Sequence, residues 1–152
     1  MLEFGVIAEI KAIADRYELK IIEDASHSIG STYVHDGKNH YCGDGVHSDF
    51  CTYSFHPVKH ITSGEGGAVV TSNSNYASMI RLFRNHGITS DHHDRLRQGA
   101  HSYQMVELGY NYRITDFQFI HTIYCFFKEF IKNGFMNINP VHSAAGLTSS
   151  VA

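Results

Sequence analysis

A helix that runs directly into a strand ending in two acids is the feature of this sequence that most restricts its fold. Apolar side chains recur at helical spacing over residues 6–17, which predicts an amphipathic helix with one buried stripe. A short apolar run at residues 19–22 predicts a buried strand, which stops at Glu23 and Asp24. This order favours an α/β fold, in which ligand-binding groups collect at the carboxyl ends of strands.

The pair Asp36 and Gly37 predicts a tight turn, so residues 31–34 are expected to form a small hairpin with residues near Tyr41. The other expected strands cover residues 48–54 and 66–71, with a loop over residues 55–65 between them.

Two further helices are expected. Ser74 is the predicted N-cap of a helix that ends near residue 85, and Gly87 just beyond it is a typical C-terminal signal. The last helix is expected to begin at Thr115 or Asp116 and to end near residue 132. Residues 88–107 are polar and are expected to form an exposed loop, and residues 133–152 show no periodicity.

Charge and hydropathy exclude several classes of partner. The net charge is −3, from 12 basic and 15 acidic residues, and no block of Lys or Arg is present to follow a phosphate backbone, so no nucleic acid partner is expected. The longest apolar stretch, residues 117–127, is interrupted by polar residues and is shorter than the ~20 residues of a membrane span. Three cysteines without a paired framework, and an N-terminus that carries charges too early for a signal peptide, favour a cytoplasmic location.

Lys59 stands apart from the five other lysines of the chain. It lies between two expected strands, beside Pro57 and just before the glycine-rich segment 64–67. A nucleophilic lysine must lose its proton near neutral pH, and a tight loop in an α/β site provides the necessary desolvation. We interpret the glycine-rich segment as the turn that lets the backbone pass close to this lysine. The alternative is an ordinary solvated lysine, which is the commoner case.

Asp24 and Ser54 are the other candidates that the expected strand ends provide. A carboxylate in the place of Asp24 is most often a helix cap or a solvated acid. Pyridoxal phosphate (PLP) chemistry nevertheless requires such a group, because a paired carboxylate keeps the pyridine nitrogen protonated. Ser54 is placed to offer its hydroxyl to a phosphate, or is an ordinary serine at the edge of a sheet.

Twelve histidines raise the alternative of a small metal-binding α/β module. The best cluster for such a site contains His35, His40, Cys42 and His47. Their spacing matches no standard zinc pattern, and three of the four fall around the predicted turn. We therefore expect no metal site.

Four segments in this order carry a resemblance to a known family. They read Glu-Asp-Ala-Ser-His at 23–27, Ser-Phe-His-Pro-Val-Lys at 54–59, Gly-Glu-Gly-Gly at 64–67 and Gly-Tyr-Asn-Tyr-Arg at 109–113. Together they resemble the DegT/DnrJ/EryC1/StrS family of PLP-dependent sugar aminotransferases, and the resemblance extends over residues 6–118. It implies part of the large domain of a fold type I aminotransferase, with a mixed, mostly parallel sheet flanked by helices.

The resemblance implies a role for each matching position in binding PLP. Asp24 matches the acid that pairs with the ring nitrogen, and His27 matches a residue that contacts the ring and its phenolic oxygen. Ser54 matches a phosphate ligand. Lys59 matches the lysine that holds the cofactor as a Schiff base, and with Asp24 it forms the expected catalytic pair.

The resemblance also implies partners. Asn111 matches a residue that reaches the phosphate of the neighbouring subunit's cofactor in family homodimers, with Arg113 beside it as a further contributor. Within the family the chain is most similar to enzymes that aminate UDP-linked 4-keto-6-deoxy-N-acetylhexosamines on the pseudaminic acid pathway. The expected substrates are therefore a nucleotide-linked keto-sugar and glutamate as the amino donor.

The family's chains are much longer than this one, and the resemblance stops near Phe117. We therefore expect residues 1–116 to form a partial PLP-binding large domain and residues 117–152 to form a divergent C-terminal helix and tail, with the family's small domain absent. The expected activity is that of a sugar aminotransferase of which this chain is a fragment. The alternative within the family is a non-catalytic truncated remnant.

Overall fold

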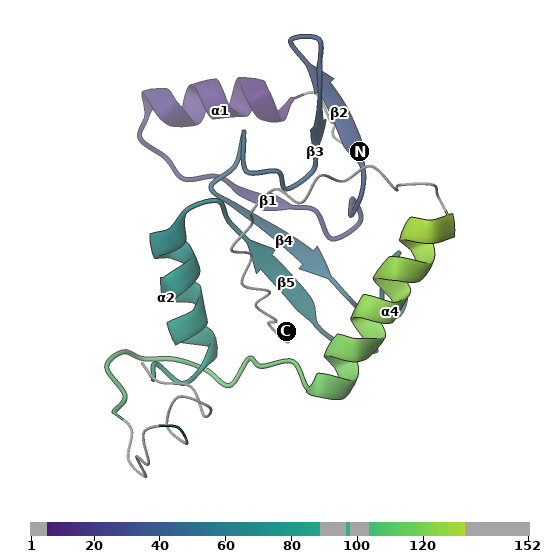
Figure 1. Cartoon of the computed structure of the whole chain (residues 1–152). Helices are drawn as coiled ribbons and strands as arrows, with labels where there is room; N and C mark the ends of the chain where they lie inside the picture. The colour runs from purple at the N-terminus through teal and green to yellow at the C-terminus, as the bar shows by residue number, and fades with distance from the viewer. Residues whose placement is uncertain (1–5, 89–96, 98–103, 133–152) are drawn as a thin grey trace.

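A computed structural model describes residues 6–88, 97 and 104–132 of the chain, with side chains up to residue 128 (Figure 1). Most of the loop expected at residues 88–107, and all of the segment 133–152, lie outside the described residues.

The fold is built around a mixed sheet of three strands in the order β1–β4–β5, formed by Ile22–Asp24, Phe50–Ser54 and Gly67–Val70 (Figure 1). β1 runs parallel to β4, with Asp24 opposite Thr52, and β5 runs antiparallel to β4, with Gly67 opposite Ser54. This register brings the carboxyl ends of β1 and β4 and the start of β5 to one edge of the sheet. The mixed α/β architecture expected from the sequence is confirmed.

The first strand differs from its prediction in position and in burial. It includes the two acids rather than stopping at them, and Leu19 and Ile22 are 60% and 68% exposed. Within the described residues β1 has a paired neighbour on one side only, and its inward position is occupied by Glu23. The Glu23 carboxylate accepts hydrogen bonds from the backbone N–H of Gly43, at 3.1 Å, and from Ser48 Oγ, at 3.0 Å. The prediction of a buried apolar strand at residues 19–22 was wrong, because this strand turns an acid inward.

The expected hairpin is present as β2 (Thr32–His35) and β3 (Lys38–Tyr41), with Thr32 opposite Tyr41. Asp36 and Gly37 between the strands both have positive φ angles, of 49° and 71°. An Asp-Gly pair tolerates this conformation, which matches the twist of the two strands. The predicted turn is confirmed.

Three helices in the described part of the chain lie around the sheet: α1 (Ile7–Arg16), α2 (Ser74–Arg84) and α4 (Asp116–Lys132). Each lies where the sequence predicts a helix, but the predicted cap of α2 was wrong by one residue. Asn73 is the N-cap, because its side chain accepts hydrogen bonds from the backbone N–H groups of the second and third residues of the helix, at 2.9 and 3.2 Å. Gly87 follows the helix with a φ of 67°, as its C-terminal signal predicts.

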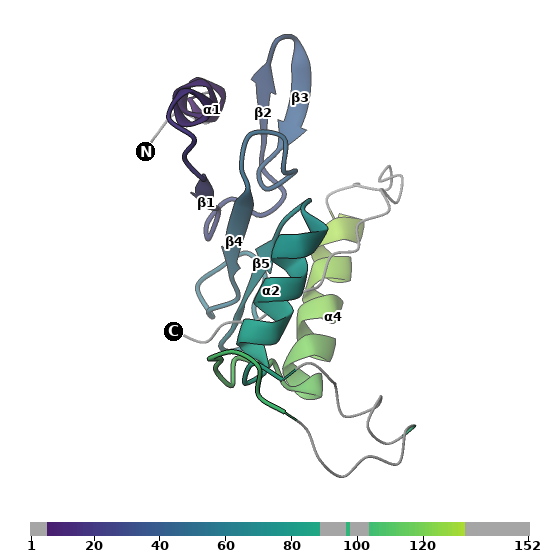
Figure 2. The ribbon, with the colours of Figure 1, turned by 90° about the vertical axis from the view of Figure 1, so that its left-hand side faces the viewer.

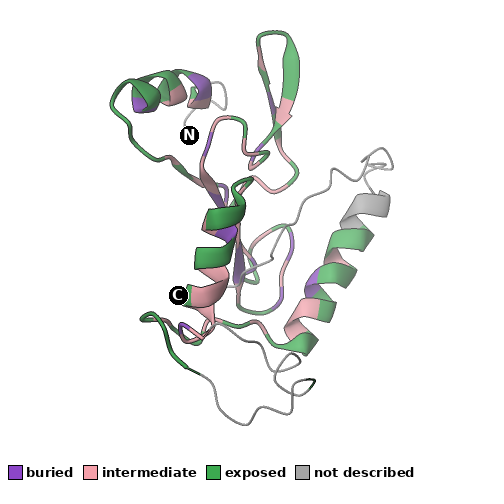
Figure 3. Ribbon diagram, turned by 60° about the vertical axis from the view of Figure 1, so that its left-hand side comes forward, coloured by how far each residue is buried: buried purple, intermediate pink, exposed green. Residues whose placement is uncertain are grey.

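Figure 2 shows α2 and α4 on one side of the sheet and α1 on the other, near the hairpin. Burial follows the central strands and the loop after β4, whereas much of each helix surface is exposed (Figure 3). One core cluster contains Ala25, Tyr33, Cys42 and Cys51, and a second contains Phe55, Ile61 and Ala68. The second cluster lies under the loop that carries Lys59 and anchors it. Among the residues that the structure describes, no helix combines the length and hydropathy that crossing a bilayer requires.

Candidate active site

Asp24 lies at the carboxyl end of β1, where a local turn holds its side chain. The backbone N–H and the hydroxyl of Ser26 donate to Asp24 Oδ1 at 3.0 and 2.5 Å. The Ser26 hydroxyl, then the Ser26 backbone N–H and the nearby side chains of Lys59 and His27, hold the pKa of Asp24 below its usual value. Asp24 is exposed in this chain. The turn therefore presents an ionised carboxylate at the functional edge of the sheet.

Lys59 is carried by a loop that closes on itself after β4. The backbone N–H of Phe55 donates to the carbonyl of Gly66 at 2.8 Å, and that of Ser63 donates to the carbonyl of Phe55 at 3.0 Å. Phe55 and Ile61 are buried beneath the loop, and the backbone N–H of Lys59 donates to the carbonyl of His56 at 2.9 Å. These contacts fix the backbone of a half-buried lysine between two strands, as its place in the sequence predicts.

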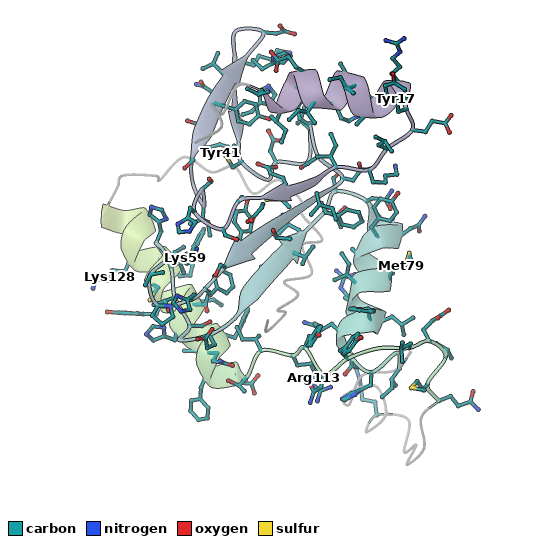
Figure 4. The ribbon with its side chains drawn as sticks, turned by 180° about the vertical axis from the view of Figure 1, so that it is seen from behind. Tyr17, Tyr41, Lys59, Met79, Arg113 and Lys128 are labelled. Carbon is teal, nitrogen blue, oxygen red and sulfur yellow. The ribbon has the colours of Figure 1, made fainter. Side chains whose placement is uncertain are left out.

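The last helix supports the loop from outside. Gln118 Nε2 donates to the carbonyl of Glu65 at 3.1 Å, and His121 Nδ1 lies 2.9 Å from the carbonyl oxygen of Thr62. Figure 4 shows Lys59 beside α4. α4, which begins at Asp116 near the end of the resemblance to the family, thus helps to shape the site.

A pocket of about 430 Å³ opens at this edge of the sheet. Its wall includes Lys59, Ser54, Ser26, Thr52, Glu65 and Gly66. Lys59 Nζ is in hydrogen-bonding contact with Nε2 of His27, from the turn after β1. Gly66 has a φ of 140°, and a Cβ at that position would lie 3.0 Å from Ser63 Oγ. A glycine at this position therefore lets the pocket wall pack closely against Ser63.

Asn111 lies outside this pocket. The segment 109–113 is docked on the end of α2, where the backbone N–H of Tyr110 donates to the carbonyl of Phe83 at 2.7 Å and that of Tyr112 to the carbonyl of Arg84 at 3.0 Å. Figure 4 shows Arg113 below α2, well apart from Lys59. The structure brings together Asp24, His27, Ser54 and Lys59, and it leaves Asn111 at another surface.

The sequence prediction missed Ser26, Thr52 and Glu65, all of which line the pocket. Ser26 had a readable signal, because an acid followed two residues later by serine is typical of a side-chain turn that orients the carboxylate. Thr52 is found only through the register that pairs it with Asp24. Glu65 could be assigned to the pocket only from the path of the loop, which the sequence of the loop does not specify.

The histidines that suggested a metal site pack together without forming one. His47 lies with its ring centroid 5.0 Å from that of His40 and 5.1 Å from that of His35, and His47 Nδ1 is 2.6 Å from the hydroxyl oxygen of Tyr33. His40 Nδ1 is 3.0 Å from Asp44 Oδ2. Over the described ranges, no three His, Cys, Asp or Glu side chains are placed so that they could hold a metal ion.

This histidine cluster predicts a pH-dependent stability. Burial first, and then the neighbouring charges of His40, His35 and Lys11 against the opposing effect of Asp44, lower the pKa of His47 from its ordinary 6.5. The unfolded chain therefore binds more protons than the folded one just below pH 6.5, so the free energy of unfolding falls as the pH drops from about 7.5 to about 5.5. Denaturant midpoints at these two pH values measure the loss.

His47→Gln, which keeps a hydrogen-bonding side chain beside Tyr33 but does not titrate, should lose less stability over the same interval. An equal loss in the variant and the natural sequence would contradict the role of His47. Asp24 and Asp49, whose pKa values are lowered, stabilise the fold while they are ionised. This contribution is lost only at a more acidic pH, below about 3.8.

The groups in and beside the pocket fit PLP. The pKa of Asp24 is low enough to keep a carboxylate available for a protonated ring nitrogen, and the serine hydroxyls and glycine-lined backbone offer donors to a phosphate. The Lys59 amine shares the same space. Solved structures that share this fold include an aminotransferase and a putative sugar aminotransferase, and the chain has the fold of the fold type I aminotransferases.

The chain belongs to the DegT/DnrJ/EryC1/StrS aminotransferase family, whose sequence profile matches residues 4–120. A UDP-4-amino-4,6-dideoxy-N-acetyl-beta-L-altrosamine transaminase of Campylobacter jejuni is 44% identical over 108 residues, which are 71% of this chain and 25% of that protein. The chain therefore spans about a quarter of the length of this relative.

Two solved structures show the same relation. The aminotransferase PseC of Helicobacter pylori, involved in the biosynthesis of pseudoaminic acid, matches with a TM-score of 0.65 and 25% identity over 80% of this chain and 29% of its own. The PLP form of the putative sugar aminotransferase Spr1654 of Streptococcus pneumoniae matches with a TM-score of 0.55 and 26% identity, over 72% of this chain and 26% of its own. The family expected from the four sequence segments is thus confirmed.

Proposed function

We propose that this chain supplies the PLP-binding core of an aminotransferase that transfers an amino group from glutamate to a nucleotide-linked 4-keto-6-deoxy sugar. The observation that carries the proposal is the convergence of Asp24, His27 and Lys59 at one edge of the sheet, beside a pocket that Lys59 and Ser54 line. These residues come from two segments far apart in the sequence, and the parallel pairing of β1 with β4 brings them together.

Each of these residues has a distinct task. With PLP bound, Asp24 would accept a hydrogen bond from the protonated ring nitrogen, His27 would contact the ring, and Ser54 would donate its hydroxyl to the phosphate. When bound, the cofactor supplies an electron sink for the carbanion that forms at the substrate carbon. Asp24 maintains that sink, because its ionised side chain favours the protonated ring.

Lys59 serves first as the covalent attachment point for the cofactor and then as the base. Once the donor amine has displaced it, Lys59 Nζ is a free amine beside the reacting carbon. It takes the proton from the α carbon of glutamate and, in the second half of the reaction, returns a proton to the carbon of the sugar that receives nitrogen. A half-buried position suits this task, because it limits competing hydration of the amine.

Similarity to the Campylobacter transaminase supports a UDP-linked N-acetylhexosamine as the acceptor. The position of Asn111, on a surface separate from the pocket, supports a homodimer in which it reaches the phosphate in the neighbouring subunit. Cys42, Cys51 and Cys125 are free thiols, which supports a reducing compartment such as the cytoplasm.

A chimera tests the proposal. Replacing the matched segment of the Campylobacter transaminase with the corresponding segment of this chain should give an enzyme that aminates the parent's keto-sugar with glutamate. The expectation follows from the 44% identity and from the presence of the pocket residues in the inserted segment. Turnover is measured by formation of 2-oxoglutarate and of the amino sugar.

The matched control is the same chimera carrying Lys59→Ala, which should fold and dimerise but show no turnover. A folded, dimeric chimera without activity would contradict the proposal that this segment retains a working site. In any active form that includes this segment, preference for a dTDP-linked keto-sugar would overturn the UDP-linked substrate and leave the proposed transamination chemistry in place.

A further inference from the structure

Lys59 and His27 meet beside the pocket although 32 residues separate them in the sequence. The lysine comes from the loop after β4, and the histidine comes from the turn after β1. Their side-chain nitrogens, Nζ of the lysine and Nε2 of the imidazole, are in hydrogen-bonding contact. The contact joins Lys59, the expected attachment point of the cofactor, to an imidazole that can accept or donate a proton.

The fold fixes both ends of this contact. The backbone N–H of Ala25 donates to the carbonyl of Thr52 at 2.9 Å, and that of Ser28 donates to the carbonyl of Ala25 at 2.9 Å. The first bond ties the turn to β4, and the second closes the turn around His27. Because the Lys59 backbone is also bonded to its own loop, the two side chains meet without any rearrangement of the chain.

Chemistry restricts the protonation of the pair. An ammonium group has hydrogens to donate but no lone pair, so a protonated Lys59 needs an imidazole whose Nε2 carries a lone pair. We assign the proton of the neutral ring to Nδ1 on this ground. The titratable groups around the contact are Asp24 at the end of β1, and His56 and Glu65 on the pocket wall. The Asp24 carboxylate favours a positive charge on the pair, wherever the proton lies.

We infer that His27 is a positioning residue and proton acceptor for Lys59 before the cofactor is bound, a role that rests on the proposed attachment of the cofactor at Lys59. It holds Nζ in the pocket and takes one proton from it as the aldehyde of PLP arrives. The N–H bond breaks, its electron pair stays on Nζ, and the proton moves to Nε2 of His27.

The condensation of Lys59 Nζ with the aldehyde of PLP then needs no other reactant. The lone pair on Nζ attacks the aldehyde carbon, and the electrons of the carbon–oxygen π bond move to oxygen, which takes a second proton from the nitrogen. His27 returns its proton to this oxygen, which leaves as water while a carbon–nitrogen double bond forms. One ammonium and one aldehyde have become one iminium and one water, and His27 is neutral again.

The rate at which Lys59 captures PLP tests this inference. The protein is mixed with PLP between pH 5.5 and 8.5, reduced with borohydride at timed intervals, and the pyridoxyl adduct on the Lys59 peptide is quantified by mass spectrometry. In the natural sequence the capture rate should fall as the pH is lowered, because a protonated imidazole cannot accept the proton of Lys59. His27→Phe should lower the rate near pH 7.5 by about 10²-fold, the lower end of the effect of a placed proton acceptor.

His27→Gln separates positioning from proton transfer. Glutamine retains a hydrogen bond to Lys59 but cannot take up its proton, so this variant should exceed His27→Phe in rate and lose the part of the pH dependence that His27 causes. His60→Gln, an exposed histidine next to Lys59 in the sequence, should match the natural protein. Capture at Lys59 with unchanged rate and pH profile in His27→Phe would overturn the inference and leave the proposed function standing. Absence of any adduct at Lys59 in the natural protein would overturn both.

Discussion

Replacing Asp24 with asparagine should lower the transamination rate of the chimera by about 10²- to 10³-fold while Lys59 still captures the cofactor. The asparagine has nearly the same shape and still accepts hydrogen bonds from Ser26, but it carries no charge to keep the ring nitrogen protonated. Electron withdrawal by the ring is then weaker when the carbanion forms. Steady-state turnover with glutamate measures the loss, and borohydride trapping measures the capture.

Asp49→Asn is the matched control for this prediction. Asp49 also has a lowered pKa, but it accepts its hydrogen bonds from the backbone of Ile21 and from Lys20, away from the pocket. The control should change stability and leave the turnover rate of the folded chimera nearly unchanged. Equal turnover in the Asp24 variant and its parent would show that the carboxylate does not act on the ring.

Gly87→Ala should destabilise the chain by about 3–5 kcal/mol, because it combines backbone strain with a steric clash. Gly87 has a φ of 67°, and a Cβ there would lie 1.8 Å from the carbonyl oxygen of Glu107. The clash separates the end of α2 from the segment that carries Asn111. Chemical denaturation of the purified variant measures the effect.

Gly30→Ala isolates the strain from the clash. Gly30 has a similar φ of 77°, but no atom lies within 4 Å of the position of an added Cβ. Its substitution should cost about 1 kcal/mol, from the left-handed backbone alone. Equal destabilisation by the two alanines would mean that the clash between residue 87 and Glu107 costs nothing. The close approach of these two residues would then not contribute to the stability of the fold.

The elements that the sequence predicts best are those with strong local signals. The hairpin follows from an Asp-Gly pair whose residues both adopt positive φ, and the position of α1 follows from helical spacing. The prediction that this stripe is buried was wrong, because Ile10, Ile13 and Tyr17 are exposed and only Ala14 of the stripe is buried in the described chain. The cap of α2 was misplaced because Asn73 and Ser74 are both good N-cap residues, and the local signal does not separate them. β1 was misplaced because its three residues turn an acid inward, where Gly43 and Ser48 bind it.

The candidate site shows the same contrast between local sequence signals and long-range contacts. Lys59 is recognisable from its loop, and Asp24 from its place at the end of a strand. The contact between His27 and Lys59 depends on which strands are neighbours and in what register, and no local pattern around either residue encodes that pairing. The roles of Asp24, His27, Ser54, Lys59 and Asn111 stay predictions until cofactor binding is measured.

The 152-residue chain alone should turn over glutamate slowly or not at all, because Asp24 is exposed and Asn111 is expected to act in a neighbouring subunit. The most direct measurement on the account is therefore attachment, not turnover: reduction of the PLP-treated chain with borohydride, followed by peptide mapping. The account predicts a pyridoxyl adduct on the peptide that contains residues 55–61, absent in Lys59→Ala and retained in Lys38→Ala. An adduct spread evenly over several lysines, and unchanged in Lys59→Ala, would contradict the assignment of Lys59 as the cofactor-binding residue.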